Sequence, residues 1–310
     1  MLKEIVTPLL SWYDENKRTL PWRDRHNAYY TWVSEIMLQQ TRVEAVKPYF
    51  ERFISELPDI SSLAVCPEEK LMKLWEGLGY YSRVRNMQEA AKTVEKEYNG
   101  KLPEDFEALL SLKGIGSYTA GAIASIAYGI PVPAVDGNVL RVISRITESR
   151  EDIGKAAVKR KTEKLLEEIM PKDRPGDFNQ ALMELGAVIC IPNGQAKCLV
   201  CPVSGKCLAN RNHTVEEIPV KAPKKPRVVE ERTVFVIQDG AATAILKRPD
   251  KGLLAGLYEL PNTLGYMEQE EAVSYVKNMG LEPLYIESLP AAKHIFSHIE
   301  WRMKAYRVRV

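Results

Sequence analysis

Leu112-Lys113-Gly114-Ile115-Gly116-Ser117-Tyr118-Thr119-Ala120 lies between two segments of helical pattern. Two glycines around one apolar residue predict a tight turn, because glycine adopts backbone conformations that other residues avoid. Without a Cβ at Gly114 and Gly116, the backbone can approach a ligand closely. The N–H groups at the start of the next helix, at the positive end of its dipole, suit a phosphate. The stretch therefore predicts two helices joined by a turn that can hold a phosphate.

The residues around this turn, 1–210, predict helix after helix, and no alternating strand pattern interrupts them. Cys66-Pro67-Glu68-Glu69 and Leu102-Pro103-Glu104-Asp105 place a proline and acids where helices begin. Residues 155–170 have apolar side chains at helical spacing and end before Pro171. This setting favours a helix-hairpin-helix motif, which binds the DNA backbone without distinguishing bases, although an ordinary helix–helix turn also explains the stretch alone.

The composition changes near residue 211. Residues 211–232 contain three prolines and many charges, and we expect a linker there. Four cations of this stretch could contact phosphates: Lys221, Lys224, Lys225 and Arg227. A solvated spacer explains them equally well. Residues 233–310 contain short β-rich runs around one helical stretch, 270–279, which predicts a small α+β domain. Because the last strand pattern reaches Val310 without a capping turn, we expect this domain to be incomplete at its C-terminal end.

Size and composition indicate a soluble protein of two domains. The chain has 310 residues, of which 45% are hydrophobic and 27% charged. No segment approaches the length of uncharged apolar chain that spans a bilayer, and the N-terminus lacks the features of a secretory signal. We therefore expect a cytoplasmic protein without a membrane partner. The net charge of +2 neither requires nor excludes nucleic acid.

Four of the five cysteines form one short group with the spacing C-x7-C-x2-C-x5-C over residues 190–207: Cys190, Cys198, Cys201 and Cys207. Four thiolates this close can bind one metal centre, either a [4Fe–4S] cluster or a structural zinc ion. Only Cys198 and Cys201 have a spacing typical of zinc sites, so the pattern favours iron–sulfur over zinc. Buried free thiols are the third alternative, which the polar, loop-forming residues of the segment disfavour.

Two carboxylates are candidates for catalysis. Glu35 lies in an apolar stretch, between Trp32, Val33, Ile36 and Met37, where a buried carboxyl prefers to be protonated. Asp136 lies next to a glycine after an apolar run, at an expected helix start. A protonated glutamate with an ionised aspartate is the pair that cleavage of an N-glycosidic bond needs. Each position also has a simpler explanation. Glu35 could lie on the polar edge of its helix, and Asp136 could only cap a helix.

The order of hairpin, aspartate and cysteine group resembles the helix-hairpin-helix DNA glycosylases with an iron–sulfur cluster, and among them the adenine DNA glycosylases of the MutY family. Further matching motifs cover most of the first domain: Leu20–Arg23, Ser34–Thr41, Gly77–Arg83 and Val135–Val139. Tyr118 stands where the lyase branch of the superfamily has a nucleophilic lysine, which indicates a monofunctional glycosylase. The cysteine pattern departs from the family by one residue, since its first gap is seven residues and not six.

The resemblance implies a fold and a substrate. The first domain, residues 1–210, would be mainly α, with a six-helix barrel and an iron–sulfur cluster domain. The second, residues 233–310, would be a smaller Nudix-like α+β domain that recognises 8-oxoguanine through Phe296, Ser297 and His298. The paired glutamates of a Nudix pyrophosphatase are missing around residues 256–280, so recognition and not hydrolysis is expected there. The implied partner is double-stranded DNA with adenine opposite 8-oxoguanine or guanine.

The resemblance also implies roles for single residues. Glu35 would protonate the adenine, Asp136 would stabilise the sugar cation, and Asn138 and Tyr118 would orient these groups. The remaining contacts to DNA would come from the adenine pocket (Trp22, Arg23, Val43), the space that adenine vacates (Gln40, Leu78, Tyr80), the hairpin (Gly114, Gly116) and Thr41. The product would be an abasic site in base excision repair, made by a monomer associated with the nucleoid.

Two other functions stay open at this point. One is a related glycosylase that acts on oxidised pyrimidines or on mismatched thymine, against which Tyr118 and the Phe-Ser-His loop argue. The other is an iron–sulfur protein that binds DNA without catalysis. The presence of both Glu35 and Asp136 argues against it, because a protein that only binds has no need of a buried acid.

Overall fold

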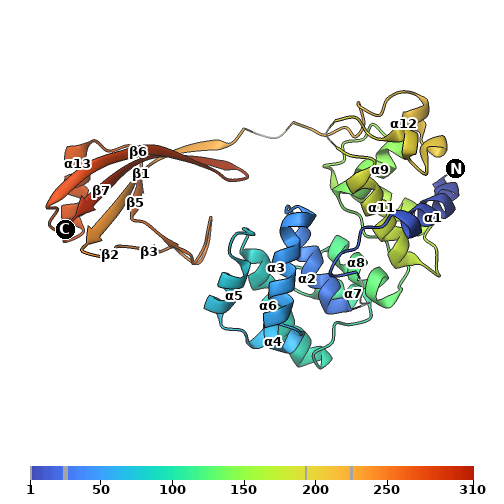
Figure 1. Cartoon of the computed structure of the whole chain (residues 1–310), viewed down its shortest axis with the longest axis horizontal. Helices are drawn as coiled ribbons and strands as arrows, with labels where there is room; N and C mark the ends of the chain where they lie inside the picture. The colour runs from blue at the N-terminus through green and yellow to red at the C-terminus, as the bar shows by residue number, and fades with distance from the viewer. Residues whose placement is uncertain (1, 24–26, 193, 224–225) are drawn as a thin grey trace. The chain divides into compact units, whose positions relative to one another are not determined.

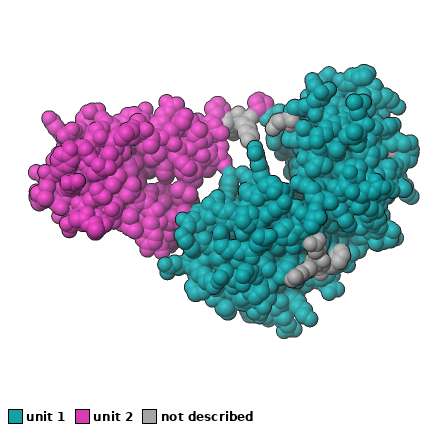
Figure 2. Space-filling view, in the orientation of Figure 1, with its two compact units in different colours: residues 1–222 teal, residues 223–310 magenta. Residues whose placement is uncertain are grey.

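The chain consists of two compact units, Met1–Ala222 and Pro223–Val310 (Figure 2). The computed structural model describes residues 2–23, 27–192, 194–223 and 226–310. Lys224 and Lys225, two of the linker cations, lie outside the described residues. No helix in the described part of the chain is both long and apolar enough to cross a membrane.

All regular elements in the described residues of the first unit are helices, as the sequence predicts (Figure 1). Its helices are η1 Leu2–Ile5, α1 Val6–Asn16, α2 Ala28–Leu38, α3 Val43–Glu56, α4 Ile60–Val65, α5 Glu68–Trp75, α6 Ser82–Tyr98, α7 Phe106–Ser111, α8 Ser117–Tyr128, α9 Gly137–Thr147, α10 Ala156–Glu167, α11 Pro175–Val188, η2 Cys198–Val200, η3 Ser204–Lys206 and α12 Leu208–Arg211. Carboxylates and an amide cap several of them, since Asn27, Asp59, Asp105 and Asp136 each accept a backbone N–H from the first turn.

The helical unit has two hydrophobic cores. The first is formed by residues 20–124 and contains Trp32, Phe53 and Trp75. The second combines α1 with residues 135–203 and contains Tyr13 and Phe178. Helix α2 is buried on most of its surface in the first core and packs against α3 and α8. Helix α8 also packs against α11, whose residues belong to the second core, so α8 connects α2 with the second core.

Close packing fixes the chain segment that leads to Asp136. A Cβ added to Gly121 of α8 would lie 2.2 Å from the carbonyl oxygen of Pro133, so only glycine allows this approach. Asn179 of α11 holds the same segment, because its Oδ1 accepts the N–H of Ala134 (3.0 Å) and its Nδ2 donates to the carbonyl of Val132 (2.9 Å). Asn179 is fully buried, so both hydrogen bonds form away from water.

Residues 212–222 pack against the helical unit. Nε of Arg145 donates to the carbonyl of Ile218 (2.7 Å), and the N–H of Ile153 donates to the carbonyl of Val220 (3.1 Å). Ile218 itself is buried. These contacts join the first half of the proline-rich stretch to the first unit, which is why the two units separate at residue 222 and not at 211.

The second unit is a mixed sheet with one described helix (Figure 1). Its strands are β1 Val228–Asp239, β2 Ala242–Thr243, β5 Asn262–Leu264, β6 Tyr285–Ile295 and β7 Ile299–Arg309, and β3 Leu246–Lys247 pairs separately with β4 Tyr258–Glu259. Strands β1 and β7 run parallel, and β6 and β7 antiparallel. Helix α13 Gln269–Asn278 covers one face, where the ring of Tyr275 stacks on Phe235 at 4.8 Å.

We predict that Gly121→Ala destabilises the helical unit by about 2–3 kcal/mol, because the added methyl group must displace the backbone at Pro133. Gly137→Ala is the matched control, since a Cβ at Gly137 meets no atom within 4 Å and the position is the first of a helix. Thermal unfolding followed by far-ultraviolet circular dichroism compares the two variants. Equal midpoints would contradict the close approach of α8 to Pro133.

Candidate functional site

A groove of about 1030 Å³ in the helical unit contains all four candidate catalytic residues and five of the predicted DNA-binding residues. Its lining includes Trp22, Arg23, Glu35, Gln40, Thr41, Val43, Tyr118, Asp136 and Asn138. These residues come from the loop after α1, from α2 and the turn that follows it, and from the starts of α3, α8 and α9. The groove thus lies between the two cores, and it brings the two candidate carboxylates to one site.

Glu35 is the buried acid of the groove. The phenol O–H of Tyr118 donates a hydrogen bond to Oε2 of Glu35. Burial raises the pKa of Glu35 from 4.5 to about 7, and the charge of Asp136 adds to this rise, whereas the Tyr118 hydrogen bond and the charge of Arg23 oppose it. Burial also raises the pKa of Tyr118 well above its ordinary value, so this phenol stays a donor. The carboxyl can therefore hold a proton near neutral pH.

Asp136 both caps a helix and lines the groove, so the two interpretations of this residue hold together. Its Oδ1 accepts the N–H of Val139 (2.8 Å), and its Oδ2 accepts the side-chain amide of Asn138 (2.7 Å). Burial raises the pKa of Asp136, while these hydrogen bonds oppose the rise. Asn138 accordingly fixes the carboxylate that faces the groove.

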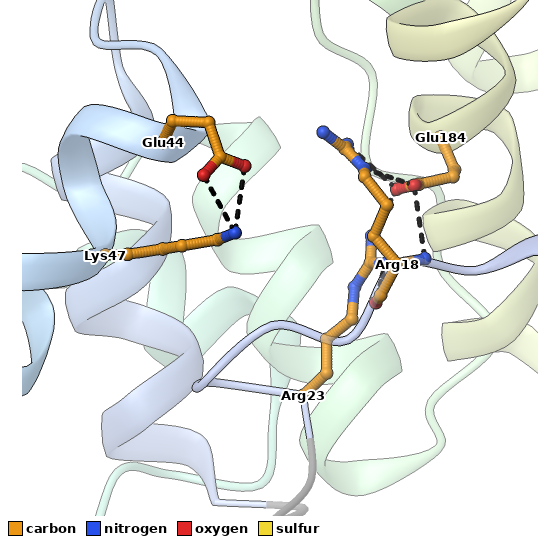
Figure 3. A network of polar contacts seen from close by, with 5 residues as sticks. All are labelled: Arg18, Arg23, Glu44, Lys47 and Glu184. Atoms are coloured by element: carbon orange, nitrogen blue, oxygen red, sulfur yellow. Dashed lines mark hydrogen bonds and ion pairs between the residues drawn. The ribbon is translucent and has the colours of Figure 1, made fainter.

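A buried glutamate that the sequence analysis missed joins two arginines at the groove (Figure 3). Glu184 of α11 accepts Nε of Arg18 (2.5 Å) and Nη2 of Arg23 (2.7 Å), and its side chain is only 1% exposed. Burial would raise the pKa of Glu184, but the hydrogen bonds and charges of both arginines bring it below its usual value. Opposite them in Figure 3, Glu44 of α3 pairs with Lys47 (2.8 Å). The signal that could have identified Glu184 is its position inside the apolar run 181–187.

Hydrogen bonds connect Asp136 with the cysteine segment. Asn138, which donates to Asp136, accepts Nη2 of Arg141 (2.9 Å) at its Oδ1. Arg141 in turn donates through Nε to the carbonyl of Cys190 (2.8 Å). Nη1 of Arg145 donates to Sγ of Cys190 (3.2 Å). The two arginines therefore tie the first cysteine to α9, and Asn138 connects Arg141 to the start of this helix.

The four cysteines surround one cavity. Cys190, Cys198, Cys201 and Cys207 all line it, together with apolar side chains such as Val142 and Leu185. In the described part of the chain, no three His, Cys, Asp or Glu side chains lie close enough to share a single metal ion. Burial raises the pKa of Cys201 to about 12, so thiolates at this place require a positive centre to balance them. Thiols spaced around a cavity fit a cluster of several metal atoms better than one zinc ion.

The turns after α2 and α5 hold three of the other predicted residues. Gln40 is exposed and has a left-handed backbone (φ 63°), as has Tyr80 (φ 47°), which is 47% exposed. Leu78 is buried beside Tyr80 and does not line the groove. The hairpin glycines also lie outside the groove lining: Gly114 has φ 82°, and Gly116 is the residue before α8. Gly114 leaves no room for a Cβ, because Cβ of Asn86 would lie 2.8 Å away.

Phe296, Ser297 and His298 form the connection between β6 and β7 in the second unit. The ring of Phe296 packs edge-on against Trp301 (4.9 Å) and His294 (4.4 Å). Nε of Arg227 donates to the carbonyl of Phe296 (3.1 Å), and the N–H of Val228 donates to the carbonyl of His298 (3.0 Å). These contacts hold the loop backbone while Ser297 and His298 stay exposed.

Family models match both units. Residues 33–168 match the HhH-GPD superfamily of base excision DNA repair proteins, and residues 233–310 match the NUDIX domain. A solved thermostable thymine-DNA glycosylase superimposes with a TM-score of 0.62 at 28% identity, over 68% of this chain and 96% of its own. The predicted fold class, a mainly α helix-hairpin-helix glycosylase fold with a smaller Nudix-like α+β domain, is confirmed.

Two curated relatives match over almost the whole chain. An adenine DNA glycosylase of Arabidopsis thaliana is 38% identical over 98% of this chain, which spans 56% of the length of that relative. An adenine DNA glycosylase of Mus musculus is 36% identical over 96% of this chain, which spans 69% of its length. The helical fold is thus shared with proteins named for two different target bases.

We predict that the unfolding free energy contains a pH-dependent contribution from Glu35. Because its folded pKa of about 7 lies above 4.5, this contribution is complete below pH 4.5 and is lost as the pH rises to about 7. The free energy of unfolding of Glu35→Gln minus that of the wild type should therefore increase from pH 5 to pH 8, by on the order of 3 kcal/mol at most. Urea unfolding at both pH values measures this difference. Glu97→Gln, on an exposed position of α6, is the control, and an equal shift in both variants would contradict the raised pKa.

Proposed function

Because this chain belongs to the adenine DNA glycosylase family of the helix-hairpin-helix superfamily, we propose that it hydrolyses the N-glycosidic bond of adenine mispaired with 8-oxoguanine or guanine. The predicted resemblance to the MutY family is confirmed by these relatives. The observation that supports the activity best is one groove with a buried carboxyl of pKa about 7 and a second carboxylate. Such a pair suits the departure of a base from a sugar.

Glu35 acts as the general acid in this proposal. An adenine in the groove accepts its proton at N7, which turns the base into a leaving group. A proton is available near neutral pH because burial holds it on the carboxyl. Tyr118 keeps the carboxyl in one orientation through its hydrogen bond to Oε2. Trp22, Arg23 and Val43 line the same groove and would surround the base.

Asp136 acts on the sugar. As the base leaves, positive charge develops at C1′, and an ionised carboxylate next to it lowers the energy of this state. The hydrogen bonds from Asn138 and Val139 favour the ionised form of Asp136 and keep it in place before the reaction starts. Water then completes an abasic site. The charge balance is simple, since Glu35 gives a proton to adenine and water restores it.

The DNA contacts follow the positions of the remaining predicted residues. The hairpin at Gly114 and Gly116, at the start of α8, would hold a backbone phosphate. The turns with Gln40, Thr41 and Tyr80, with Leu78 behind them, would occupy the space that an extruded adenine leaves, because a glycosylase must take its base out of the stack. Phe296, Ser297 and His298 would contact the 8-oxoguanine. We expect a monomer.

The cysteine cavity is suited to a [4Fe–4S] cluster, bound by Cys190, Cys198, Cys201 and Cys207. When bound, the cluster would supply a rigid, positively charged centre that holds the four thiolates. The chain itself then keeps residues 190–207 folded beside α9, where Arg141 and Arg145 contact Cys190. The seven-residue first gap is accommodated in a loop, which can absorb one additional residue.

Base release from defined duplexes tests the proposed function. We expect fast single-turnover release of adenine opposite 8-oxoguanine, slower release opposite guanine and none opposite thymine, with alkali revealing the abasic sites. Release of thymine from a G·T mismatch, without release of adenine, would contradict the proposal and favour a related glycosylase that acts on mismatched thymine. Tight binding without release from any duplex would support the non-catalytic alternative and contradict the proposal.

The same measurement identifies the acid and the charge-stabilising residue. Glu35→Gln and Asp136→Asn should each lower the rate by about 10²–10⁴-fold while leaving duplex binding, since each removes one interaction made in the transition state. Glu97→Gln, exposed on α6, is the matched control and should keep the wild-type rate. A rate near wild type for either active-site variant would refute its assigned role.

Metal analysis tests the cluster. We predict about four iron atoms and equal acid-labile sulfide per purified chain, and loss of both in Cys198→Ser, because a cluster needs all its thiolates. Cys66→Ser is the matched control, since the fifth cysteine is buried beside α5 and does not line the cavity. One zinc ion per chain and no iron would overturn the iron–sulfur assignment.

A further inference from the structure

One arginine of α6 joins two turns that are far apart in the sequence. Nη1 of Arg83 donates to the carbonyls of Ile36 (2.6 Å) and Gln39 (2.7 Å), at the end of α2. Its Nη2 donates to the carbonyls of Leu78 and Gly79, both at 3.1 Å, in the turn after α5. The guanidinium therefore forms hydrogen bonds to the backbone of both turns.

Both turns have a strained residue at an exposed tip. Gln40 follows Gln39 with φ 63°, and Tyr80 follows Gly79 with φ 47°, in the left-handed region that disfavours side chains with a Cβ. Both tips are exposed, so no burial of the tip side chains compensates for the strain. Strained residues persist where the surrounding structure over-determines them. Here Arg83 binds the carbonyl directly before each tip, that of Gln39 and that of Gly79.

The geometry suits arginine and no other cation. Four acceptors in two directions match the planar fork of a guanidinium, whereas a lysine has a single point charge with three donors. The plane of Arg83 also lies over the ring of Trp75 at 5.3 Å and near the ring of Tyr80 at 5.6 Å. The last carbonyls of α2 lack partners within the helix, and a cation there is favoured by the helix dipole.

This arrangement costs the folded state free energy. Burial lowers the pKa of Arg83, and its Nε has no hydrogen-bond partner in the described part of the chain. A partly buried charge with an unsatisfied donor is unfavourable unless its other contacts compensate. An apolar side chain would avoid this cost but would leave four backbone carbonyls without this donor, so the link between the turns is the property that requires an arginine.

We propose that Arg83 is a positioning residue that makes the Gln40 and Tyr80 turns enter DNA as one rigid unit. The inference rests on the proposed function, in which these turns replace an extruded adenine. Two turns held together at their carbonyls share the cost of opening the stack, whereas two independent turns must each be ordered when they meet DNA. Arg83 touches neither carboxylate, so its loss affects opening of the duplex and not the chemical step.

Arg83→Lys tests this inference, with Arg85→Lys as the matched control. Arg85 lies on the same helix and pairs with Glu68 (2.9 Å) on the outside of the unit. A duplex with 2-aminopurine next to the mispaired adenine becomes fluorescent when the stack opens. At saturating protein we expect Arg83→Lys to lose most of this signal and to release adenine at least about tenfold more slowly, while Arg85→Lys behaves as wild type. Full fluorescence with Arg83→Lys would overturn the inference.

A mutant cycle is a second test of the coupling, and its wild-type arm does not require Arg83→Lys to fold. In the wild-type background, the effects of Gln40→Ala and Tyr80→Ala on the opening signal should be non-additive by about tenfold, because each turn depends on the other. In the Arg83→Lys background the same two effects should be additive. Additive effects in the wild-type background would overturn the inference. Wild-type protein that releases no base would instead refute the proposed function, and the coupling with it.

Discussion

The removal of one carboxyl from water is the constraint on which the rest of the site depends. Glu35 lies on α2, whose other residues are almost all apolar and packed in the first core. The same packing that makes α2 stable leaves its carboxyl without enough water to ionise it at the usual pH. Tyr118, which α8 brings beside it, donates a hydrogen bond but does not reverse this effect. Stability of the first core and acidity of the site thus have the same physical origin.

The second carboxylate is placed by contacts of a different kind. Gly121 allows the backbone at Pro133 to touch α8, and Asn179 binds the same segment from α11. Asp136 at its end is held by backbone and amide hydrogen bonds, and Arg141 extends these to Cys190. The position of the cysteine segment and the position of Asp136 therefore depend on each other. A metal centre that orders the cysteines would order the carboxylate as well, without taking part in the chemistry.

Local patterns were sufficient to predict much of this fold and site. Glycine spacing identified the hairpin, helix starts identified α5 and α7, apolar spacing identified α10, and a carboxyl in an apolar run identified Glu35. Contacts between distant residues were beyond such patterns. Glu184 meets Arg18 across 166 positions of the chain, and Arg83 meets Ile36 across 47, and nothing local distinguishes these arginines from others on the surface. The return of residues 212–222 to the helical unit escaped prediction for the same reason, because prolines and charges alone resemble a free spacer.

The dependence of Glu35 on burial links occupancy of the groove to its protonation. Water is the component that stabilises the charged carboxylate, so any planar, weakly polar group that displaces water from the groove raises the pKa of Glu35 further. Binding equilibria are reciprocal, and the occupant consequently binds more tightly to the protonated site than to the ionised one. In the proposed reaction, the base that fills the groove would thereby favour the protonated state of the acid that acts on it.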